Sequence, residues 1–368
     1  MVVWIDGKNP TLYSTGISSW LHNLLKNLNP DELSGSVLIT PNVQKLSVYP
    51  DINIPKLKLP WARMLPRKLN HMVYDRLTFR TYSFISKPEK IFSPYFDVTP
   101  ARGIPHVITV HDLCFIEVPE LYPLLQRFYY LSLLRRNLKN AELVVTVSET
   151  SRKTILKHFD LPSTKILVIP NGLNPEFTGK SPTSLEISNL RESFGKCTFL
   201  ILYTSGFENR KNLSRLVQAL SILSDDGVDF KFLITGKVHA GWNQLLAKFP
   251  TIRDKTQFLG FLSNEDMKTT YSSVDVVVFP SLNEGFGRSC LESMSTGTPL
   301  ACSNLPVFQE VAGDYAHYFS PNNPQDMSIK ILEALNFGRK NPVQPVPITD
   351  SPGFIALRKY LFGYPQAS

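Results

Sequence analysis

The sequence predicts an α/β protein made of two doubly wound, Rossmann-like domains, each built on a parallel sheet. Short apolar runs typical of strands alternate with amphipathic runs typical of helices, and this alternation favours parallel sheets. The alternating series occurs twice, before and after a polar, proline-containing stretch that follows residue 169. With 368 residues, of which 43% are hydrophobic, the chain can build two cores of ordinary domain size.

The first series opens with an apolar run at residues 2–5, a loop that contains Gly16, and an amphipathic run at residues 17–28. A strand, a loop and a helix in this order begin doubly wound sheets. The clearest helical pattern of this half lies at residues 124–140. The other expected strands are short apolar runs at residues 36–40, 90–93, 106–110, 143–147 and 166–169. We therefore predict a first domain over residues 1–169.

The second series follows residues 170–174, which have the composition of a turn. Helical patterns are expected at residues 212–223 and beyond Gly287. The expected strands are again short apolar runs, at residues 199–205, 230–236, 256–260 and 274–280. We predict that the second domain covers residues 170–345.

The end of the chain fits neither series. Prolines occur at positions 342, 345, 347 and 352, and proline can neither donate a backbone hydrogen bond nor continue a helix interior. They indicate an extended connector, and residues 354–362 carry the last helical pattern. We therefore treat residues 346–368 as a connector and a terminal helix.

The net charge of +8 is confined to the first domain. Residues 1–169 hold 21 Lys and Arg against 13 Asp and Glu, whereas the rest of the chain holds 18 of each. Most of the excess lies at residues 56–90, where nine basic residues alternate with aromatic and aliphatic ones. This mixture suits an anionic membrane surface or an anionic lipid-linked acceptor, at roughly 1 kcal/mol per cation. Nucleic acid would attract the same charges, and a solvated helix with a buried apolar face is an equal alternative.

Cysteine usage and the terminal sequence indicate a reduced, intracellular protein. The four cysteines are scattered, without a CxxC pair or a histidine cluster at metal spacing, so we expect no metal and no disulfide. The first residues lack the basic and apolar regions of a signal peptide, and no run of 18 apolar residues occurs. We expect a cytoplasmic location.

Two carboxylates, Glu284 and Glu292, flank a turn that contains Gly285 and Gly287 and leads into a helix. Glycines let the backbone approach a ligand closely, and the helix start directs unpaired N–H groups at a bound phosphate. Carboxylates in the loop and in the first helical turn could grip two sets of sugar hydroxyls. This layout fits a sugar joined to a pyrophosphate. The alternative is an ordinary surface turn in which two glutamates happen to recur.

Two adjacent cations, Arg210 and Lys211, occupy another loop between a strand and a helix. Cations at a helix N-terminus are unfavourable unless an anion lies between them and the helix dipole. They therefore indicate an anion site, or else a basic loop that pairs with Glu208.

The first domain contributes one candidate of its own. His111 stands with Asp112 at the end of an expected strand, which is where doubly wound folds bind ligands. A single histidine at such a place is nevertheless more often structural than catalytic.

The region around the two glutamates resembles the signature of the retaining nucleotide-sugar glycosyltransferases of family 4, which have the GT-B fold. Five elements occur in the order of that signature: VDVVVFPS at 274–281, EGFG at 284–287, LE at 291–292, GTP at 297–299 and EVAGD at 310–314. Five ordered elements are far more specific than one short motif. The tripeptide HDL at 111–113 and PELYP at 119–123 are similar to mannosyl- and rhamnosyltransferases of bacterial polysaccharide or O-antigen assembly. The resemblance also implies that the terminal helix crosses back to the first domain.

The resemblance implies roles for individual residues. Glu284 would lie beside the transferred sugar, and Glu292 would bind the ribose of the nucleotide. Lys211 and Arg210 would hold the diphosphate, although Phe207 stands where many members carry an arginine. His111 would reach the donor sugar from the first domain.

The same resemblance extends the donor site through backbone contacts and the glutamate loop. Gly16 would approach the donor phosphates, or be a simple turn glycine. Phe258, Leu259 and Gly260 would grip the base through their backbone groups. The glutamate loop would add Gly285, Phe286, Gly287 and Arg288.

A metal-independent reaction without a cofactor is expected, because no DxD pair follows a strand and Asp225 and Asp226 lie in a turn. A GxSxG nucleophile motif is also missing. The family mechanism is a front-face displacement with retention, in which a donor phosphate oxygen takes the acceptor proton. The cations and the helix amides would supply most of the catalysis by stabilising the diphosphate leaving group.

We therefore predict a retaining hexosyltransferase, peripheral on the inner face of the membrane, that uses a nucleoside-diphosphate sugar. GDP-mannose or a GDP-deoxyhexose is favoured as the donor. A lipid-linked or polysaccharide molecule of lipopolysaccharide type is favoured as the acceptor. One alternative is a UDP- or dTDP-sugar transferase of the same fold. Another is a catalytically silent GT-B scaffold, which would be expected to lack Glu284, Lys211 or His111, yet all three are present. Nucleic acid is not expected as a partner, because base-reading motifs are missing.

Overall fold

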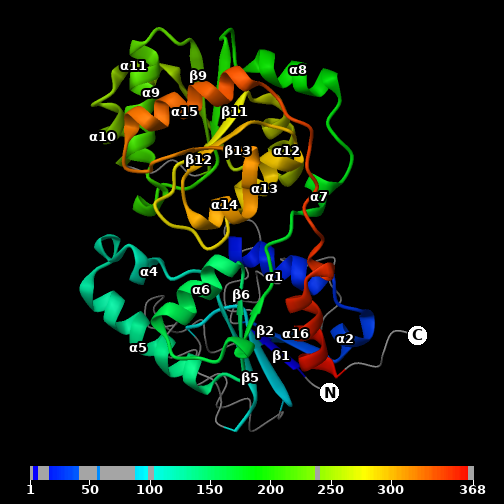
Figure 1. The fold of residues 1–368 in the computed structure, drawn as a ribbon. Helices are drawn as coiled ribbons and strands as arrows, with labels where there is room; N and C mark the ends of the chain where they lie inside the picture. The colour runs from blue at the N-terminus through cyan, green and yellow to red at the C-terminus, as the bar shows by residue number, and fades with distance from the viewer. Residues whose placement is uncertain are drawn as a thin grey trace. The chain divides into compact units, whose positions relative to one another are not determined.

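The computed structural model describes residues 3–6, 16–40, 56–58, 88–97, 103–236 and 241–363. The chain divides into two compact units, residues 1–172 with 346–368 and residues 173–345 (Figure 1). Each unit contains a parallel sheet with helices packed against it. The predicted α/β class with two parallel-sheet domains is confirmed. The predicted boundary was after residue 169, and residues 346–368 were treated as a separate segment.

The first unit is built on a seven-stranded sheet in the order β3-β2-β1-β4-β5-β6-β7, and every observed pairing is parallel. The strands are β1 (Val3–Asp6), β2 (Ser36–Thr40), β3 (Lys56–Lys58), β4 (Lys90–Ser93), β5 (His106–Val110), β6 (Leu143–Thr146) and β7 (Ile166–Val168). The strand order reverses between β1 and β4, as in doubly wound folds. The edge strand β3 was not predicted, and it is the first part of the basic stretch 56–90. Residues 59–87 of that stretch lie outside the described residues.

Helices of the first unit bury part of their apolar residues against this sheet. In α1, Trp20, Leu21, Leu24 and Leu25 recur at helical spacing and are all buried. The described helices are α1 (Gly16–Lys26), α2 (Pro30–Ser34), α4 (Cys114–Glu117), α5 (Leu124–Asn140), α6 (Glu149–His158) and α16 (Pro352–Phe362), with 3-10 turns at Pro119–Leu121, Ser163–Lys165 and Ile348–Asp350. Across all described ranges, none of the helices is both long and apolar enough to cross a membrane.

The terminal helix α16 belongs to the first unit although it comes after the second unit in sequence. It packs on β7, where a Cβ at Gly353 would lie 2.1 Å from the carbonyl oxygen of Val168. Arg358 of α16 pairs with Glu32, with 2.9 Å between Nη2 and Oε2, and both side chains are largely buried. Only glycine allows this close approach, so Gly353 sets where α16 lies on the first unit.

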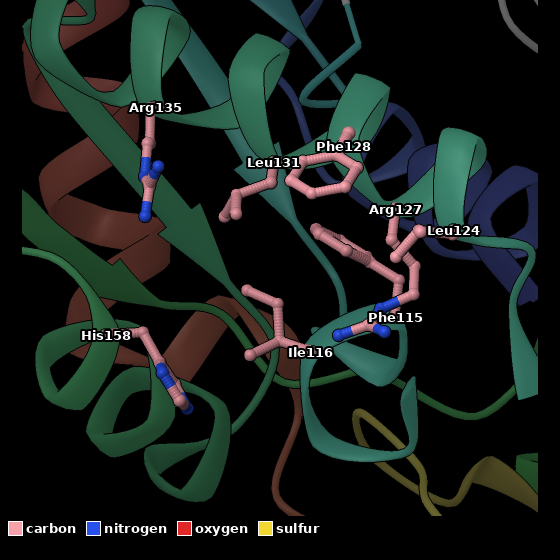
Figure 2. Close-up of a pocket in the computed structure, with 8 residues that line it drawn as sticks. All are labelled: Phe115, Ile116, Leu124, Arg127, Phe128, Leu131, Arg135 and His158. Carbon is pink, nitrogen blue, oxygen red and sulfur yellow. The ribbon is translucent and has the colours of Figure 1, made fainter. Parts of the chain in front are cut away.

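Helices α4, α5 and α6 enclose a hollow of about 170 Å³ on the surface of the first unit (Figure 2). Apolar side chains line most of it, and three basic side chains border them. The lining residues are Phe115, Ile116, Leu124, Arg127, Phe128, Leu131, Arg135 and His158.

The second unit is built on a six-stranded sheet in the order β10-β9-β8-β11-β12-β13, again with parallel pairings throughout. The strands are β8 (Phe199–Tyr203), β9 (Phe230–Thr235), β10 (Thr256–Gly260), β11 (Val276–Phe279), β12 (Leu300–Ser303) and β13 (Ala316–Phe319). The order reverses between β8 and β11. In a sheet of this kind, the carboxyl ends of the two strands at the reversal are the place where ligands bind.

Long helices cover the second sheet and complete its core. Leu216, Val217 and Leu220 of α9 are fully buried, as are Ile331 and Ala334 of α15. The described helices are α7 (Pro175–Thr178), α8 (Ser184–Ser193), α9 (Leu213–Asp225), α10 (Gly241–Leu246), α11 (Pro250–Lys255), α12 (Asn264–Ser273), α13 (Arg288–Ser295), α14 (Pro306–Ala312) and α15 (Pro324–Phe337), with 3-10 turns at Asn209–Lys211 and Gly313–Tyr315.

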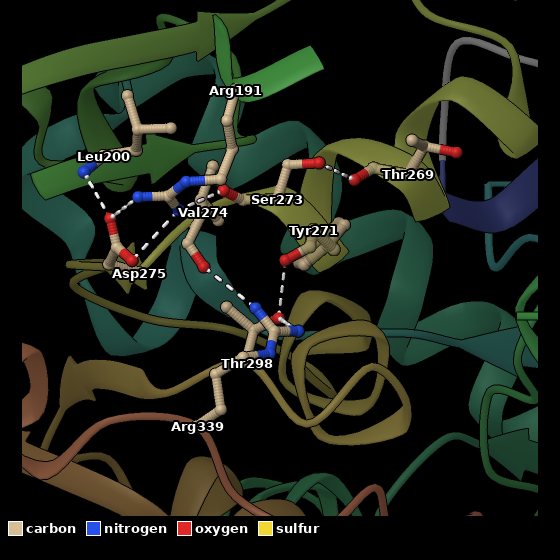
Figure 3. Close-up of polar contacts among 9 residues, drawn as sticks. All are labelled: Arg191, Leu200, Thr269, Tyr271, Ser273, Val274, Asp275, Thr298 and Arg339. Atoms are coloured by element: carbon tan, nitrogen blue, oxygen red, sulfur yellow. Dashed lines mark hydrogen bonds and ion pairs between the residues drawn. The ribbon is translucent and has the colours of Figure 1, made fainter. Parts of the chain in front are cut away.

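Two arginines form hydrogen bonds with the segment that connects α12 to β11 and with residues beside it (Figure 3). Arg191 of α8 binds both carboxylate oxygens of Asp275, at 3.0 and 3.1 Å. Arg339, which follows α15, donates to the carbonyl of Val274 at 3.1 Å and to the hydroxyl of Thr298 at 3.1 Å. The Thr298 hydroxyl in turn donates to the carbonyl of Tyr271 at 2.6 Å. The network therefore holds the end of α12, which carries Tyr271.

Candidate functional site

Two loops meet at the carboxyl ends of β8 and β11 in the second unit. The loop after β8 leads through the turn Asn209–Lys211 into α9, and the loop after β11 leads into α13. The backbone N–H of Leu282 donates to the carbonyl of Arg210 at 2.8 Å, which ties the second loop to the first. Asn212, in the left-handed conformation with φ of 57°, donates its side-chain amide to the carbonyl of Pro280 at 3.0 Å. The loops are thus fixed to each other where the strand order reverses.

Glu284 lies between the two predicted cations. Its Oε1 accepts hydrogen bonds from Lys211 Nζ at 2.5 Å and from the Ser281 hydroxyl at 2.7 Å, and its Oε2 accepts from Arg210 Nη1 at 3.1 Å. The Glu284 side chain is only 10% exposed. The sequence placed these residues in one site but did not predict their direct contact. Arg210 also pairs with Glu208, the alternative considered for these cations, with 2.7 Å between Nε and Oε2.

The cations keep Glu284 ionised. Burial by itself would raise the pKa of this carboxyl, but the charges of Lys211 and Arg210 and the hydrogen bonds outweigh burial, so its pKa is lower than usual. Lys211 Nζ also lies 5.2 Å from the centre of the Phe279 ring. The cluster therefore holds two cations beside one ionised carboxylate, and a polyanionic ligand would compete with Glu284 for those cations.

Gly287 fixes the start of α13. Its φ is +94°, in the left-handed region, and it directly precedes Arg288, the first residue of the helix. A Cβ at this position would lie 2.7 Å from Cε1 of the buried Phe308. A side chain is excluded both by the backbone conformation and by the ring behind it. Gly285 and Phe286, which precede it, are buried.

Replacing Gly287 with alanine is expected to lower the free energy of unfolding by about 2–4 kcal/mol, from backbone strain and overpacking together. Gly227 has a similar φ of +83° but open space around it, so Gly227→Ala isolates the strain and should cost about 1 kcal/mol. Urea unfolding of both variants measures the difference. Equal destabilisation of the two variants would show that the Phe308 ring moves aside without cost.

Glu292 is held at both carboxylate oxygens. Oε2 accepts from the Tyr271 hydroxyl at 2.8 Å, and Oε1 pairs with Arg288 Nε at 3.0 Å one turn earlier in α13. The Tyr271 hydroxyl also lies 3.3 Å from the hydroxyl of Thr204. Burial raises the pKa of Tyr271 well above its usual value, so its phenol remains a donor. The sequence did not point to Tyr271 or Thr204, because a tyrosine inside α12 and a threonine after β8 carry no motif.

The predicted base-binding positions lie on β10, an edge strand of the sheet described for this unit. The Phe258 ring packs against Trp242 at 5.3 Å and Phe207 at 6.4 Å between ring centres, so its side chain is used for packing. At Gly260 the φ is +70°, and its carbonyl accepts from the Gly236 N–H at 2.6 Å. Contact between this strand's backbone, including Leu259, and a base stays a prediction.

His111 and Gly16 belong to the first unit. His111 directly follows β5, and its Nε2–H donates to the Pro94 carbonyl at 3.0 Å, because a carbonyl can only accept. Its ring meets Trp20 of α1 edge-on, with centres 5.0 Å apart. Burial lowers the pKa of His111 to about 4, against the opposing effects of the Pro94 carbonyl and Asp112. At neutral pH the ring is therefore uncharged, with a lone pair on Nδ1. Gly16 begins the same helix α1, and a Cβ at this position would have no heavy atom within 4 Å.

We expect the His111 ring to stay neutral down to about pH 5. Its folded pKa lies below the unfolded value, so protonation favours unfolding, and the stability present above about pH 6.5 is lost as the pH falls towards 4. Histidine-labelled NMR at several pH values measures the midpoint, and His111→Gln identifies the signal. A midpoint near pH 6.5 would contradict this environment.

Two family models match the two halves of the chain. The model described as Glycosyltransferase Family 4 matches residues 16–177, and the one described as Glycosyl transferases group 1 matches residues 188–342. The chain is 30% identical over 254 residues to O-antigen chain mannosyltransferase B of Escherichia coli, a match that covers 66% of each protein. The chain thus spans just under two thirds of the length of that relative.

Two solved structures share the fold over nearly the whole chain. Sucrose-phosphate synthase from Thermosynechococcus elongatus has a TM-score of 0.73 at 16% identity, with 98% of this chain and 95% of that one covered. HepE of Anabaena, in complex with UDP-glucose, has a TM-score of 0.67 at 16% identity, with 98% and 95% covered.

Proposed function

Because the chain belongs to the glycosyl transferases of group 1, we propose that it transfers a sugar from a nucleoside-diphosphate donor bound by the second unit. The contact of Glu284 with Lys211 and Arg210 carries this proposal. This contact brings a buried carboxylate and two cations to the carboxyl ends of β8 and β11, where the strand order reverses, next to the loop that leads to the start of α13. A diphosphate needs such cations and amides, and a sugar hydroxyl needs such an acceptor.

We assign each portion of the donor to particular residues. Lys211, Arg210 and the first amides of α13 bind the diphosphate, Glu284 lies beside the sugar, and Glu292 binds the ribose. Arg288 and Tyr271 hold Glu292 in place for that contact. From the first unit, His111 offers Nδ1 as a neutral acceptor to the sugar, and the backbone of Gly16 approaches the phosphates.

The proposed reaction is a metal-independent, front-face displacement with retention. The bond from the anomeric carbon to the donor phosphate oxygen breaks, and the bond to the acceptor oxygen forms on the same face. The acceptor proton passes to a donor phosphate oxygen, so no protein base is required. Lys211 and Arg210 stabilise the leaving diphosphate, an electrostatic effect that is usually the largest single contribution to catalysis.

Mannose or a deoxyhexose, linked to GDP, is the proposed donor sugar. The relative whose name reads O-antigen chain mannosyltransferase B supports mannose, and it supports a lipid-linked or polysaccharide acceptor in lipopolysaccharide assembly. We place the protein in the cytoplasm, peripheral to the inner face of the membrane. The complex of HepE with UDP-glucose favours the second candidate, a UDP-sugar transferase of the same fold.

Thermal unfolding with GDP, UDP and dTDP tests the donor. A nucleotide at 100 times its dissociation constant stabilises the protein by about 2.7 kcal/mol. Stabilisation by GDP alone supports the mannose-type donor, whereas stabilisation by UDP alone moves the assignment to the second candidate. If no nucleotide stabilises the protein, the enzyme proposal fails and the silent GT-B scaffold is favoured.

A further inference from the structure

Helix α5 exposes apolar side chains in its first two turns. Leu124 is 62% exposed, Leu125 85%, Phe128 62% and Tyr129 45%. These four crowd into six consecutive positions, whereas the other exposed large hydrophobic residues of the described ranges are scattered over the second unit and the final segment. A contiguous apolar patch on a protein surface marks an interaction site more often than isolated residues do.

The hollow beside α5 extends this patch inward. Phe115 and Ile116 of α4 and Leu131 of α5 form its apolar floor, and its volume is about 170 Å³. A dry hollow of roughly 150 Å³ in another protein binds a benzene-sized molecule. The space is therefore sufficient for a short length of hydrocarbon chain.

Cations border the patch and the hollow. Helix α5 carries Arg127, Arg135, Arg136 and Lys139 and contains neither aspartate nor glutamate. Figure 2 shows Phe128 and Leu131 between Arg127 and Arg135. In the described structure, Arg127 Nε is buried and makes no hydrogen bond. Two acidic residues shortly precede the helix in sequence: Glu117, which pairs with His158 at 2.8 Å, and Glu120 in the turn Pro119–Leu121. The apolar side chains can contact hydrocarbon while the arginines contact phosphate, so this part of α5 suits a surface that presents both groups.

We propose that α5 docks the first unit on an anionic phospholipid bilayer. Leu124, Leu125 and Phe128 enter the interface, Arg135 and Arg136 meet lipid phosphates, and the hollow takes part of one acyl chain. A surface helix that exposes apolar side chains beside basic ones can bind a bilayer in this way, through buried apolar area and attraction to acidic lipid. The inference rests on the proposed function only for the location at a membrane. It assigns docking to α5 rather than to residues 59–87.

Sedimentation with vesicles tests this surface. Wild-type protein should bind vesicles of phosphatidylcholine with 30% phosphatidylglycerol roughly tenfold or more better than pure phosphatidylcholine at low salt, since each cation near acidic lipid contributes about fivefold. Leu125→Ser with Phe128→Ser, and separately Arg135→Glu with Arg136→Glu, should each reduce binding at least tenfold. The matched control is Leu185→Ser with Ile329→Ser, two comparably exposed residues of the second unit at 70% and 56%, which should bind like wild type.

Two results would overturn the docking surface: equal binding of wild type to both vesicle types, or full binding by both α5 variants. Nucleotide-induced thermal stabilisation of the same variants separates this inference from the proposed function. Variants that lose vesicle binding but keep the nucleotide response support both. A protein that responds to no nucleotide, yet loses vesicle binding in the α5 variants, would refute the donor proposal and support the docking surface.

Discussion

Glu284→Ala is expected to reduce sugar transfer about a thousandfold while nucleotide binding is kept or becomes tighter. The carboxylate is buried and ionised, and it accepts hydrogen bonds from Lys211 and Arg210. Its removal eliminates the proposed contact to the sugar. We expect the loss in rate to be of the size seen when an enzyme loses one group that stabilises charge in the transition state. It also removes the anion that competes with the donor diphosphate for both cations. Initial rates of transfer and the dissociation constant of GDP measure the two effects.

Two further variants separate charge from shape and one glutamate from the other. Glu284→Gln keeps the volume and one acceptor oxygen, so it controls for collapse of the loop around unpaired cations. Glu292→Ala should instead weaken nucleotide binding roughly tenfold or more, as loss of a charge-assisted bond to the ribose would. Equal losses of nucleotide affinity in Glu284→Ala and Glu292→Ala would contradict the roles assigned to them.

Most strands of the two sheets were predictable because buried parallel strands are short, continuous apolar runs. Residues 36–40 and 106–110 form strands with the predicted ends, and the run at 199–205 forms β8 over 199–203. Strands β12 and β13 were missed because their sequences, LACS and AHYF, are only four residues long and mix apolar with polar residues. Strand β3 was missed because its sequence, KLK, is short and mostly charged. It pairs at a sheet edge, where backbone hydrogen bonds to β2 suffice and an apolar side-chain pattern is not required.

The site was predictable as a set of residues but not as a set of contacts. The glycine-bracketed glutamates and the adjacent cations each have a local pattern. The bond from Lys211 to Glu284 joins positions 73 residues apart and depends on the adjacency of β8 and β11, which only the sheet order reveals. Tyr271 reaches Glu292 because α12 packs beside α13, and neither helix signals that pairing in its own sequence.

Lys211→Met is expected to reduce transfer by about 10²–10⁴-fold and to weaken nucleotide binding. Methionine keeps much of the apolar stem beside Phe279 but removes the charge that we propose stabilises the leaving diphosphate. Arg210→Met should have a smaller effect, because the exposed Glu208 already pairs with the Arg210 guanidinium and partly neutralises it. Lys255→Met is the matched control, because Lys255 Nζ also lies over a phenylalanine ring, 4.7 Å from its centre. Lys255 directly precedes β10, so it lies at the amino end of that strand and away from the carboxyl ends that form the proposed donor site. Steady-state kinetics and nucleotide titrations of the three variants rank the contributions of the three charges to transfer and to nucleotide binding. A larger loss in Arg210→Met than in Lys211→Met would reverse the assignment and make the arginine the principal diphosphate ligand.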